Sequence, residues 1–69
     1  AWNNKGLALF AQGQMAEALV AFNQATTYAP QEVDAWYNMA IVLVKLGRQE
    51  DAAACQHWAR SLEAKQATS

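Results

Sequence analysis

Two stretches of the chain decide its fold: AWNNKGLALFAQG at residues 1–13 and AWYNMAIVLVKLG at residues 35–47. The second repeats the first 34 positions later, and the matches include residue types that are uncommon in this alanine-rich chain. They are Trp2 with Trp36, Asn4 with Asn38 and Gly13 with Gly47. Similarity at a fixed period is typical of repeat architectures, in which each repeat is one supersecondary unit. The chain is therefore predicted to form a single domain of two units, residues 1–34 and residues 35–69.

Each unit is predicted to fold as two helices. In both units an apolar stripe with helical spacing stops at a glycine, Gly13 or Gly47. Glycine ends helices because it reaches positive φ without a Cβ clash. A second helical period follows each glycine, over residues 15–29 and over about residues 49–66, and Pro30 closes the first of these. No stretch alternates with period two, so the sequence predicts an all-α fold.

Small residues mark the places where the predicted helices approach closely. They recur at the same positions of both units: Gly6, Ala18 and Ala25, then Ala40, Ala52 and Ala59. Large residues accompany them: Trp2, Leu9, Phe22 and Tyr28, then Trp36, Leu43 and Leu62. Small residues set against large ones at fixed spacing indicate interdigitated packing, so both sets are predicted to form the contacts between helices.

The composition is that of a small globular domain. Of the 69 residues, 54% are hydrophobic and 16% charged, whereas a typical soluble domain carries about 25% charged residues. This amount of apolar side chain argues against intrinsic disorder. The net charge of -1 provides no basic field for nucleic acid, so no nucleic-acid partner is expected.

Three features bear on where the chain resides. The longest apolar run, residues 39–44, is much shorter than the roughly 18 residues of a membrane span, so no membrane contact is expected. Cys55 is the single cysteine, which excludes an internal disulfide and gives no sign of an oxidising compartment. The chain starts with Ala1 instead of Met and shows no signal-peptide pattern. We expect a cytoplasmic location and a piece of a longer protein.

The spacing of these residues resembles the tetratricopeptide repeat, a pattern of Trp, Leu-Gly, aromatic, Ala, aromatic, Ala and Pro. Unit one supplies Trp2, Gly6, Leu9, Ala18, Phe22, Ala25 and Pro30, and unit two supplies Trp36, Met39, Ala40, Leu43, Ala52 and Ala59. The resemblance covers essentially the whole chain. It implies an α-solenoid fragment, a right-handed stack of four antiparallel helices in two helix–turn–helix units.

Three residues depart from the family pattern. Lys5 stands where Leu is usual, Gln56 replaces the second aromatic of unit two, and Ala64 replaces its Pro. Two of the three lie in the last helix, which is therefore the least faithful element. It is expected to run past the usual stop, because the outer face of a terminal repeat meets water and not another repeat.

Residues that carry catalysis or bind metals are sparse. Cys55 and His57 lie two positions apart, so they cannot face each other on a helix. A zinc site would also need three or four ligands. Cys55 is accordingly interpreted as a structural residue, and the glycines are spaced for packing and capping, not for a phosphate loop. We predict no enzymatic activity, no metal and no cofactor.

In the tetratricopeptide family the first helix of each pair lines a concave groove that takes an extended or helical peptide. Carried onto this sequence, the resemblance implies a groove lined by Asn3, Asn4, Leu7, Phe10 and Ala11, then Asp34, Tyr37, Asn38, Ile41, Val44 and Lys45. Asn38, and less closely Asn4, match the family's groove asparagine, whose amide offers a donor and an acceptor to a ligand backbone. The alternative is that both asparagines are merely solvated helix residues.

The leading hypothesis for function is a protein-interaction scaffold that binds a peptide or a partner helix. A purely structural role, as an oligomerisation or spacer element of a larger chain, is the alternative. Tyr37, Asn38 and Lys45 also resemble pentatricopeptide repeats, which bind single-stranded RNA. Those repeats have 35 residues and are usually basic, which makes RNA binding a remote alternative.

The last predicted helix carries the candidates for self-association. Trp58 stands where unit one has the polar Gln24, and Leu62 follows one turn later. With the alanines at residues 52–54, they provide more apolar surface than one preceding helix can cover. We therefore predict a weak homodimer through this helix, with Trp58 and Leu62 in the contact; a capping role for the helix is the alternative.

Overall fold

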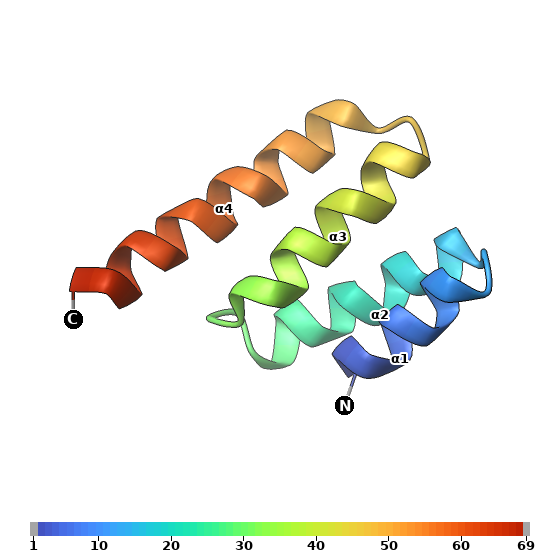
Figure 1. Cartoon of the computed structure of the whole chain (residues 1–69), viewed down its shortest axis with the longest axis horizontal. Coiled ribbons are helices and arrows are strands. Elements are labelled where there is room, and N and C mark those ends of the chain that lie inside the picture. The colour runs from blue at the N-terminus through green and yellow to red at the C-terminus, as the bar shows by residue number, and fades with distance from the viewer. Residues whose placement is uncertain (1, 69) are drawn as a thin grey trace.

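Four helices make up the computed structural model, which describes residues 2–68. They are α1 (Trp2–Ala11), α2 (Met15–Tyr28), α3 (Val33–Lys45) and α4 (Gln49–Thr68). Successive helices run antiparallel, as two helix–turn–helix units (Figure 1). No strand occurs between residues 2 and 68. The predicted all-α fold is thus confirmed, with α2 ending one residue earlier and α4 two residues later than the sequence suggested.

The packing order of the helices creates two separate surfaces. Each helix packs against the next along the chain, and α1 also contacts α3. Within the described residues the backbones of α2 and α4 are not close neighbours, and α3 lies between them. The molecule therefore has one face formed by α1 and α3, and a groove between α2 and α4 on the other side of α3.

Both short turns between paired helices end the preceding helix in the same way. Gly13 and Gly47 have φ of 80° and 79°. The N–H of Gly13 donates to the Phe10 carbonyl at 3.0 Å and that of Gln14 donates to the Leu9 carbonyl at 2.9 Å. The same two bonds recur around Gly47. This is the Schellman arrangement, in which a residue in the left-handed region lets two N–H groups satisfy the last carbonyls of the helix.

Replacing either glycine by alanine is expected to destabilise the fold by about 1 kcal/mol, because alanine pays a steric penalty in the left-handed region. A Cβ at Gly13 or Gly47 would meet nothing within 4 Å, so the cost arises from the backbone conformation alone. Gln14→Ala is the control, since Gln14 has φ of -89° and makes no capping side-chain bond. Urea denaturation measures all three variants, and a stabilised Gly13→Ala or Gly47→Ala protein would contradict this account.

The core lies around α3, where this helix packs against α2 and against α4. Phe22 and Val42 are its largest fully buried side chains. The other members of the buried cluster are Ala18, Met39, Ala40, Leu43, Ala52 and Cys55. All six predicted small residues, Gly6 included, are buried. The small positions of the repeat are therefore the places where the helices approach most closely.

Tyr28 corrects the predicted set of packing residues, because its side chain is 73% exposed. It lies on the last turn of α2, which is four residues longer than α1. Within the described residues, the ring is left in solvent at the end of α2. The side chain of Trp2, also predicted to pack between helices, lies outside the part that the structure describes.

None of the four helices, over the described residues, combines the length and the apolar character that a membrane span requires.

Candidate functional site

The α1–α3 face, defined here by Asn3, Leu7, Phe10, Asn38 and Ile41, brings residues of the two units together. The Asn38 Nδ2 donates a hydrogen bond to the Asn3 Oδ1 at 3.2 Å, and both side chains are half-buried. A side-chain amide carries two donor hydrogens and an acceptor oxygen. Each amide therefore keeps hydrogen-bonding capacity beyond this contact, at a place that solvent reaches.

A small apolar cavity lies beside this pair of amides. It has a volume of about 130 Å³ and is lined by Leu7, Phe10, Phe22, Asn38 and Ile41. Leu7 and Ile41 occupy equivalent positions 34 residues apart, and their side chains are 44% and 48% exposed. The repeat thus places one aliphatic side chain from each unit at the mouth of a cavity whose one polar neighbour is the Asn38 amide.

The other predicted groove residues do not line this cavity. Asn4, Ala11, Asp34, Val44 and Lys45 are exposed, and Tyr37 is half-buried. Asp34 lies in the first turn of α3 and Lys45 in its last turn, so their charges stand at opposite ends of the face. The structure therefore brings five of the eleven predicted groove residues together on the α1–α3 face and leaves the other six around it.

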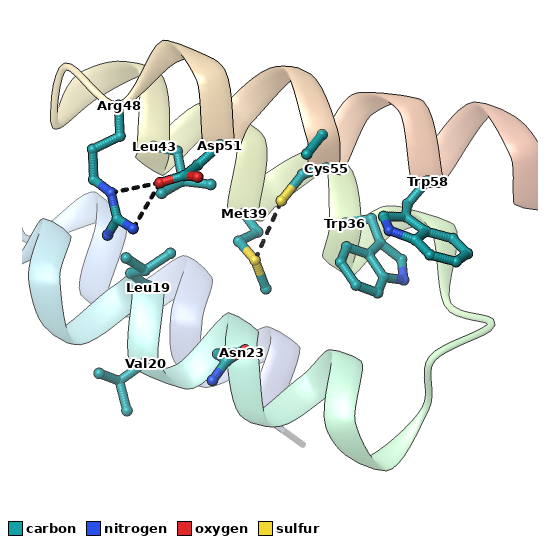
Figure 2. Close-up of a pocket in the computed structure, with 11 residues that line it drawn as sticks. Leu19, Val20, Asn23, Trp36, Met39, Leu43, Arg48, Asp51, Cys55 and Trp58 are labelled. Carbon is teal, nitrogen blue, oxygen red and sulfur yellow. Dashed lines mark hydrogen bonds and ion pairs between the residues drawn. The ribbon is translucent and has the colours of Figure 1, made fainter.

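The α2–α4 groove, on the opposite side of α3, was not predicted from the sequence. It has a volume of about 490 Å³ (Figure 2). Its lining residues come from α2, α3 and α4 and from the turn before α4: Leu19, Val20, Asn23, Trp36, Met39, Leu43, Arg48, Asp51, Ala54, Cys55 and Trp58. Apolar side chains form its floor, and Arg48 and Asp51 stand at one end of it.

Two tryptophans form the other end of the α2–α4 groove (Figure 2). The rings of Trp36 and Trp58 stack with their centroids 6.1 Å apart and their planes inclined by 24°. The Trp36 Nε1–H donates to the Pro30 carbonyl at 2.8 Å, which fixes that indole against the α2–α3 loop. Trp58 stays 56% exposed despite the stacking. One face of its ring is therefore packed while much of the side chain remains in solvent.

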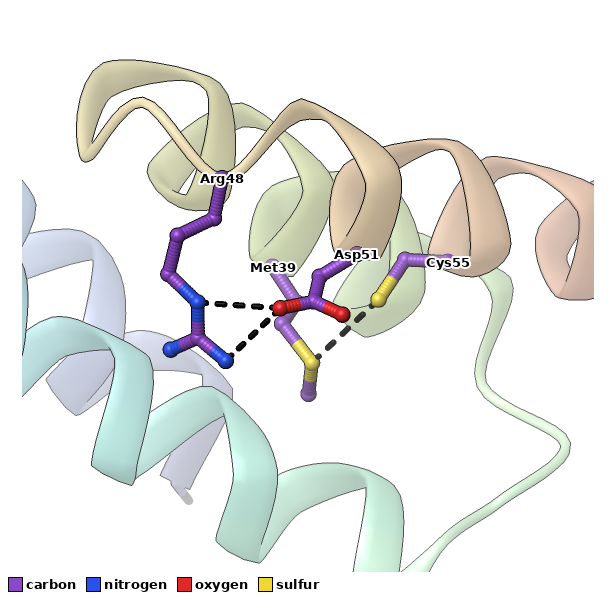
Figure 3. A network of polar contacts seen from close by, with 4 residues as sticks. All are labelled: Met39, Arg48, Asp51 and Cys55. Atoms are coloured by element: carbon purple, nitrogen blue, oxygen red, sulfur yellow. Dashed lines mark hydrogen bonds and ion pairs between the residues drawn. The ribbon is translucent and has the colours of Figure 1, made fainter.

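A polar contact at one end of this groove lies beside a sulfur contact (Figure 3). Arg48 forms an ion pair with Asp51, at 2.7 Å between Nη2 and Oδ2. The Cys55 thiol donates to the Met39 thioether sulfur at 3.5 Å. Burial, and to a smaller extent the nearby Asp51 carboxylate, raise the pKa of the Cys55 thiol. Burial therefore favours the neutral thiol over the reactive thiolate, which supports its interpretation as structural.

Residues 2–68 contain no group of three or more side chains that could hold a metal ion.

The sequence does carry a signal for the α2–α4 groove, in the positions where unit two departs from unit one. Trp58 replaces Gln24, Cys55 replaces Ala21 and Arg48 replaces Gln14. All three replacements line the groove. A repeat comparison reveals which positions have changed, but it does not reveal that these changes converge on one surface.

Comparison with known proteins gives one family match. A family model described as TPR repeat, the tetratricopeptide repeat, matches residues 6–47, which is more than half of the chain. The match covers most of α1, all of α2 and α3, and ends before α4. Of the four helices, α4 is the one that lies wholly outside the match, in line with the two family departures that it contains.

One curated relative also resembles the chain. It is an uncharacterized protein of the archaeon Methanocaldococcus jannaschii, 41% identical over 51 residues. The aligned part is 74% of this chain and 59% of that protein. The chain therefore spans about three fifths of the length of the relative.

Proposed function

Since the chain belongs to the tetratricopeptide repeat family, whose repeats are generally protein-interaction modules, we propose that its α1–α3 face binds a segment of a partner protein. The observation that carries the proposal is the Asn3–Asn38 amide pair at the edge of an apolar cavity. Amides can bond a peptide backbone of any sequence, while the cavity takes a side chain.

The size of the cavity favours a peptide over a small molecule. Sites for drug-sized ligands have volumes of about 300–1,000 Å³, whereas this cavity has about 130 Å³. A water molecule occupies about 30 Å³ in the liquid, so there is room for roughly one aliphatic side chain. A peptide that inserts one such side chain and bonds its backbone to Asn38 fits both features.

The charges along the face disfavour two other ligands. Asp34 would repel a C-terminal carboxylate bound near the start of α3, so an internal segment is the expected ligand. The chain has five Lys and Arg residues against six Asp and Glu, which gives RNA little electrostatic attraction. Tetratricopeptide repeats are typically non-enzymatic, and we propose neither a catalytic role nor a cofactor. The division into units at residues 34 and 35, and the cytoplasmic location, stay predictions.

A matched pair of substitutions tests the proposal. Peptides that bind the chain are first selected from a random library displayed on phage. Ile41→Asp places a charge on the α1–α3 face, and Val20→Asp places the same charge in the α2–α4 groove. Both aliphatic side chains are exposed, Ile41 to 48% and Val20 to 60%, so neither change should unfold the protein.

We expect Ile41→Asp to weaken binding of the selected peptide by about tenfold or more, because a buried unpaired charge at an apolar contact is costly. Val20→Asp should leave the affinity within about twofold. Asn38→Ala should weaken binding about fivefold, the value of one lost hydrogen bond. Fluorescence anisotropy measures all three. Equal effects at Ile41 and Val20, or a library that yields no binder, would contradict the proposal.

A further inference from the structure

Within the described residues, one face of the α4 helix carries a stripe of side chains that remain largely in solvent. Its residues recur at intervals of three or four and so share one face of the helix: Asp51, Ala54, Trp58, Leu62 and Lys65. Leu62 is half-buried, and the other four are exposed. The 20-residue helix is about 30 Å long. Its C-terminal part extends beyond the first turn of the antiparallel neighbour α3 (Figure 1). The stripe therefore offers a long contact surface.

The stripe on one α4 helix is complementary, in side-chain size and in charge, to the same stripe on an α4 helix that runs in the opposite direction. Trp58 lies at the middle of α4. Four residues before it stands the small Ala54 and four residues after it the large Leu62. Seven residues before it stands the acidic Asp51 and seven residues after it the basic Lys65. If a second α4 lies antiparallel to the first and is centred on Trp58, each Ala54 lies opposite a Leu62 and each Asp51 lies opposite a Lys65. The symmetry of the pair produces each of these contacts twice.

We propose that a second copy of this chain docks on α4 in antiparallel orientation, with Trp58 on the two-fold axis. Asp51 of each copy then faces Lys65 of the other, and Ala54 of each faces Leu62 of the other. A parallel arrangement would set Asp51 against Asp51 and Lys65 against Lys65, which repel. The charge pattern thus selects both the orientation and the register.

The surroundings of Trp58 have room for the second indole. The α2–α4 groove lies on one side of the ring, and a second hollow of about 330 Å³ lies on the other. That hollow is lined by Pro30, Gln31, Trp36, Trp58 and Leu62. Both hollows are mostly apolar around the tryptophans, so an aromatic ring from the second copy would replace water there.

Asp51 can accept a partner without giving up its present one. The Arg48 Nε and Nη2 atoms both contact the same oxygen of Asp51, Oδ2. A carboxylate has a second oxygen and about four lone-pair positions in total. A lysine ammonium from the second copy can therefore join the pair to form a small charge network.

The surface required is within reach of this chain. Specific interfaces bury at least about 1,200 Å² in total, or about 600 Å² from each copy. That is about an eighth of the 4502 Å² surface of the chain. Small interfaces are typical of weak, transient complexes, and we expect a dissociation constant on the order of 0.1 mM.

The proposed dimer leaves the α1–α3 face open. On α3, Asn38 and Ile41 line the cavity of that face, whereas Trp36 and Met39 line the α2–α4 groove. Residues two apart on a helix point in nearly opposite directions. Each dimer would therefore present two copies of the α1–α3 face, independently of what that face binds.

Charge reversal tests the arrangement by sedimentation equilibrium between about 10 µM and 1 mM, concentrations that bracket the expected dissociation constant. Lys65→Glu is expected to weaken the dimer about tenfold, because two attractive pairs become repulsive. Combining it with Asp51→Lys and Arg48→Glu, which keeps the local ion pair in reversed form, restores complementarity and should return the dissociation constant to within about threefold of the original. Trp58→Ala removes the contact on the axis and should weaken the dimer by at least tenfold. Circular dichroism confirms that each variant is folded.

Arg60→Glu is the matched control. It makes the same change of charge as Lys65→Glu, but Arg60 is exposed two residues from Trp58, on the opposite side of α4. Its dissociation constant should stay within about twofold of the original. Three outcomes would overturn the proposal: a monomer at every concentration, equal effects of Lys65→Glu and Arg60→Glu, or a combined charge swap that fails to restore the dimer.

Discussion

Phe22→Ala is expected to lower the free energy of unfolding by about 3–5 kcal/mol, the usual cost of removing a buried aromatic ring. Phe22 is 0% exposed and belongs to the buried cluster that α2, α3 and α4 contribute to. A single core in a chain of this size provides roughly 3–5 kcal/mol in total. The variant should therefore be largely unfolded at 25 °C, with a circular dichroism spectrum that has lost most of its helical signal.

The repeat supplies the control for this substitution. Gln56 occupies the position 34 residues after Phe22, and its side chain is exposed. Gln56→Ala is expected to change stability by less than about 0.5 kcal/mol, as surface substitutions usually do. If urea denaturation gave similar midpoints for the two variants, Phe22 would not have the central place in the core that the structure assigns to it.

Gly6→Ala is expected to destabilise the fold by about 1–3 kcal/mol, although alanine is the better helix former by about 1 kcal/mol. A Cβ at Gly6 would lie 2.6 Å from Phe22 Cε1, 2.8 Å from Cδ1 and 2.9 Å from Cζ. These contacts are too short for two carbon atoms. The ring is fully buried, so it cannot turn aside without disturbing its other neighbours.

A double-mutant cycle isolates this contact. In a Phe22→Leu background the clashing ring is absent, so Gly6→Ala should cost at least about 1 kcal/mol less than it does in the original chain. Urea denaturation of the two single variants and the double variant gives the coupling energy. Additive effects of the two substitutions would mean that Gly6 and Phe22 do not restrict each other.

The Gly6–Phe22 contact also accounts for a difference between the two units that the sequence displays without explaining. Unit two has Ala40 in place of the glycine and Gln56 in place of the phenylalanine. No buried ring lies at position 56, and the Cβ of Ala40 is accommodated in the core. The two departures are therefore linked through packing, and seeing this requires the distance between residues that are 16 positions apart in the chain.

The helix ends and the small packing residues could be predicted from the sequence because both depend on local chemistry. Each unit needs a glycine at positive φ where its first helix ends, as at Gly13. Each unit also needs a small residue where its helices approach closely, as at Ala18. The exposure of Tyr28 could not be predicted in the same way. It depends on which other segments reach the last turn of α2, and this is set by the tertiary arrangement.

The α1–α3 face could be predicted from the sequence, whereas the α2–α4 groove could not. The family resemblance implied the α1–α3 face, and the structure joins Asn3 to Asn38 there through a hydrogen bond. The α2–α4 groove arises because α2 and α4 stand apart over α3. A separation of helices follows from their tilts, which no single residue encodes, so only the aromatic Trp58 drew attention to that side.

The most direct test of the proposed function is a nuclear magnetic resonance titration of the chain with a peptide selected from the random library. The account predicts that the side-chain amide signals of Asn3 and Asn38 shift, together with the backbone signals of Leu7 and Ile41. The indole N–H signal of Trp58, on the other side of α3, should stay in place. Shifts confined to Trp58, Val20 and Asn23, with Asn3 and Asn38 unaffected, would contradict it.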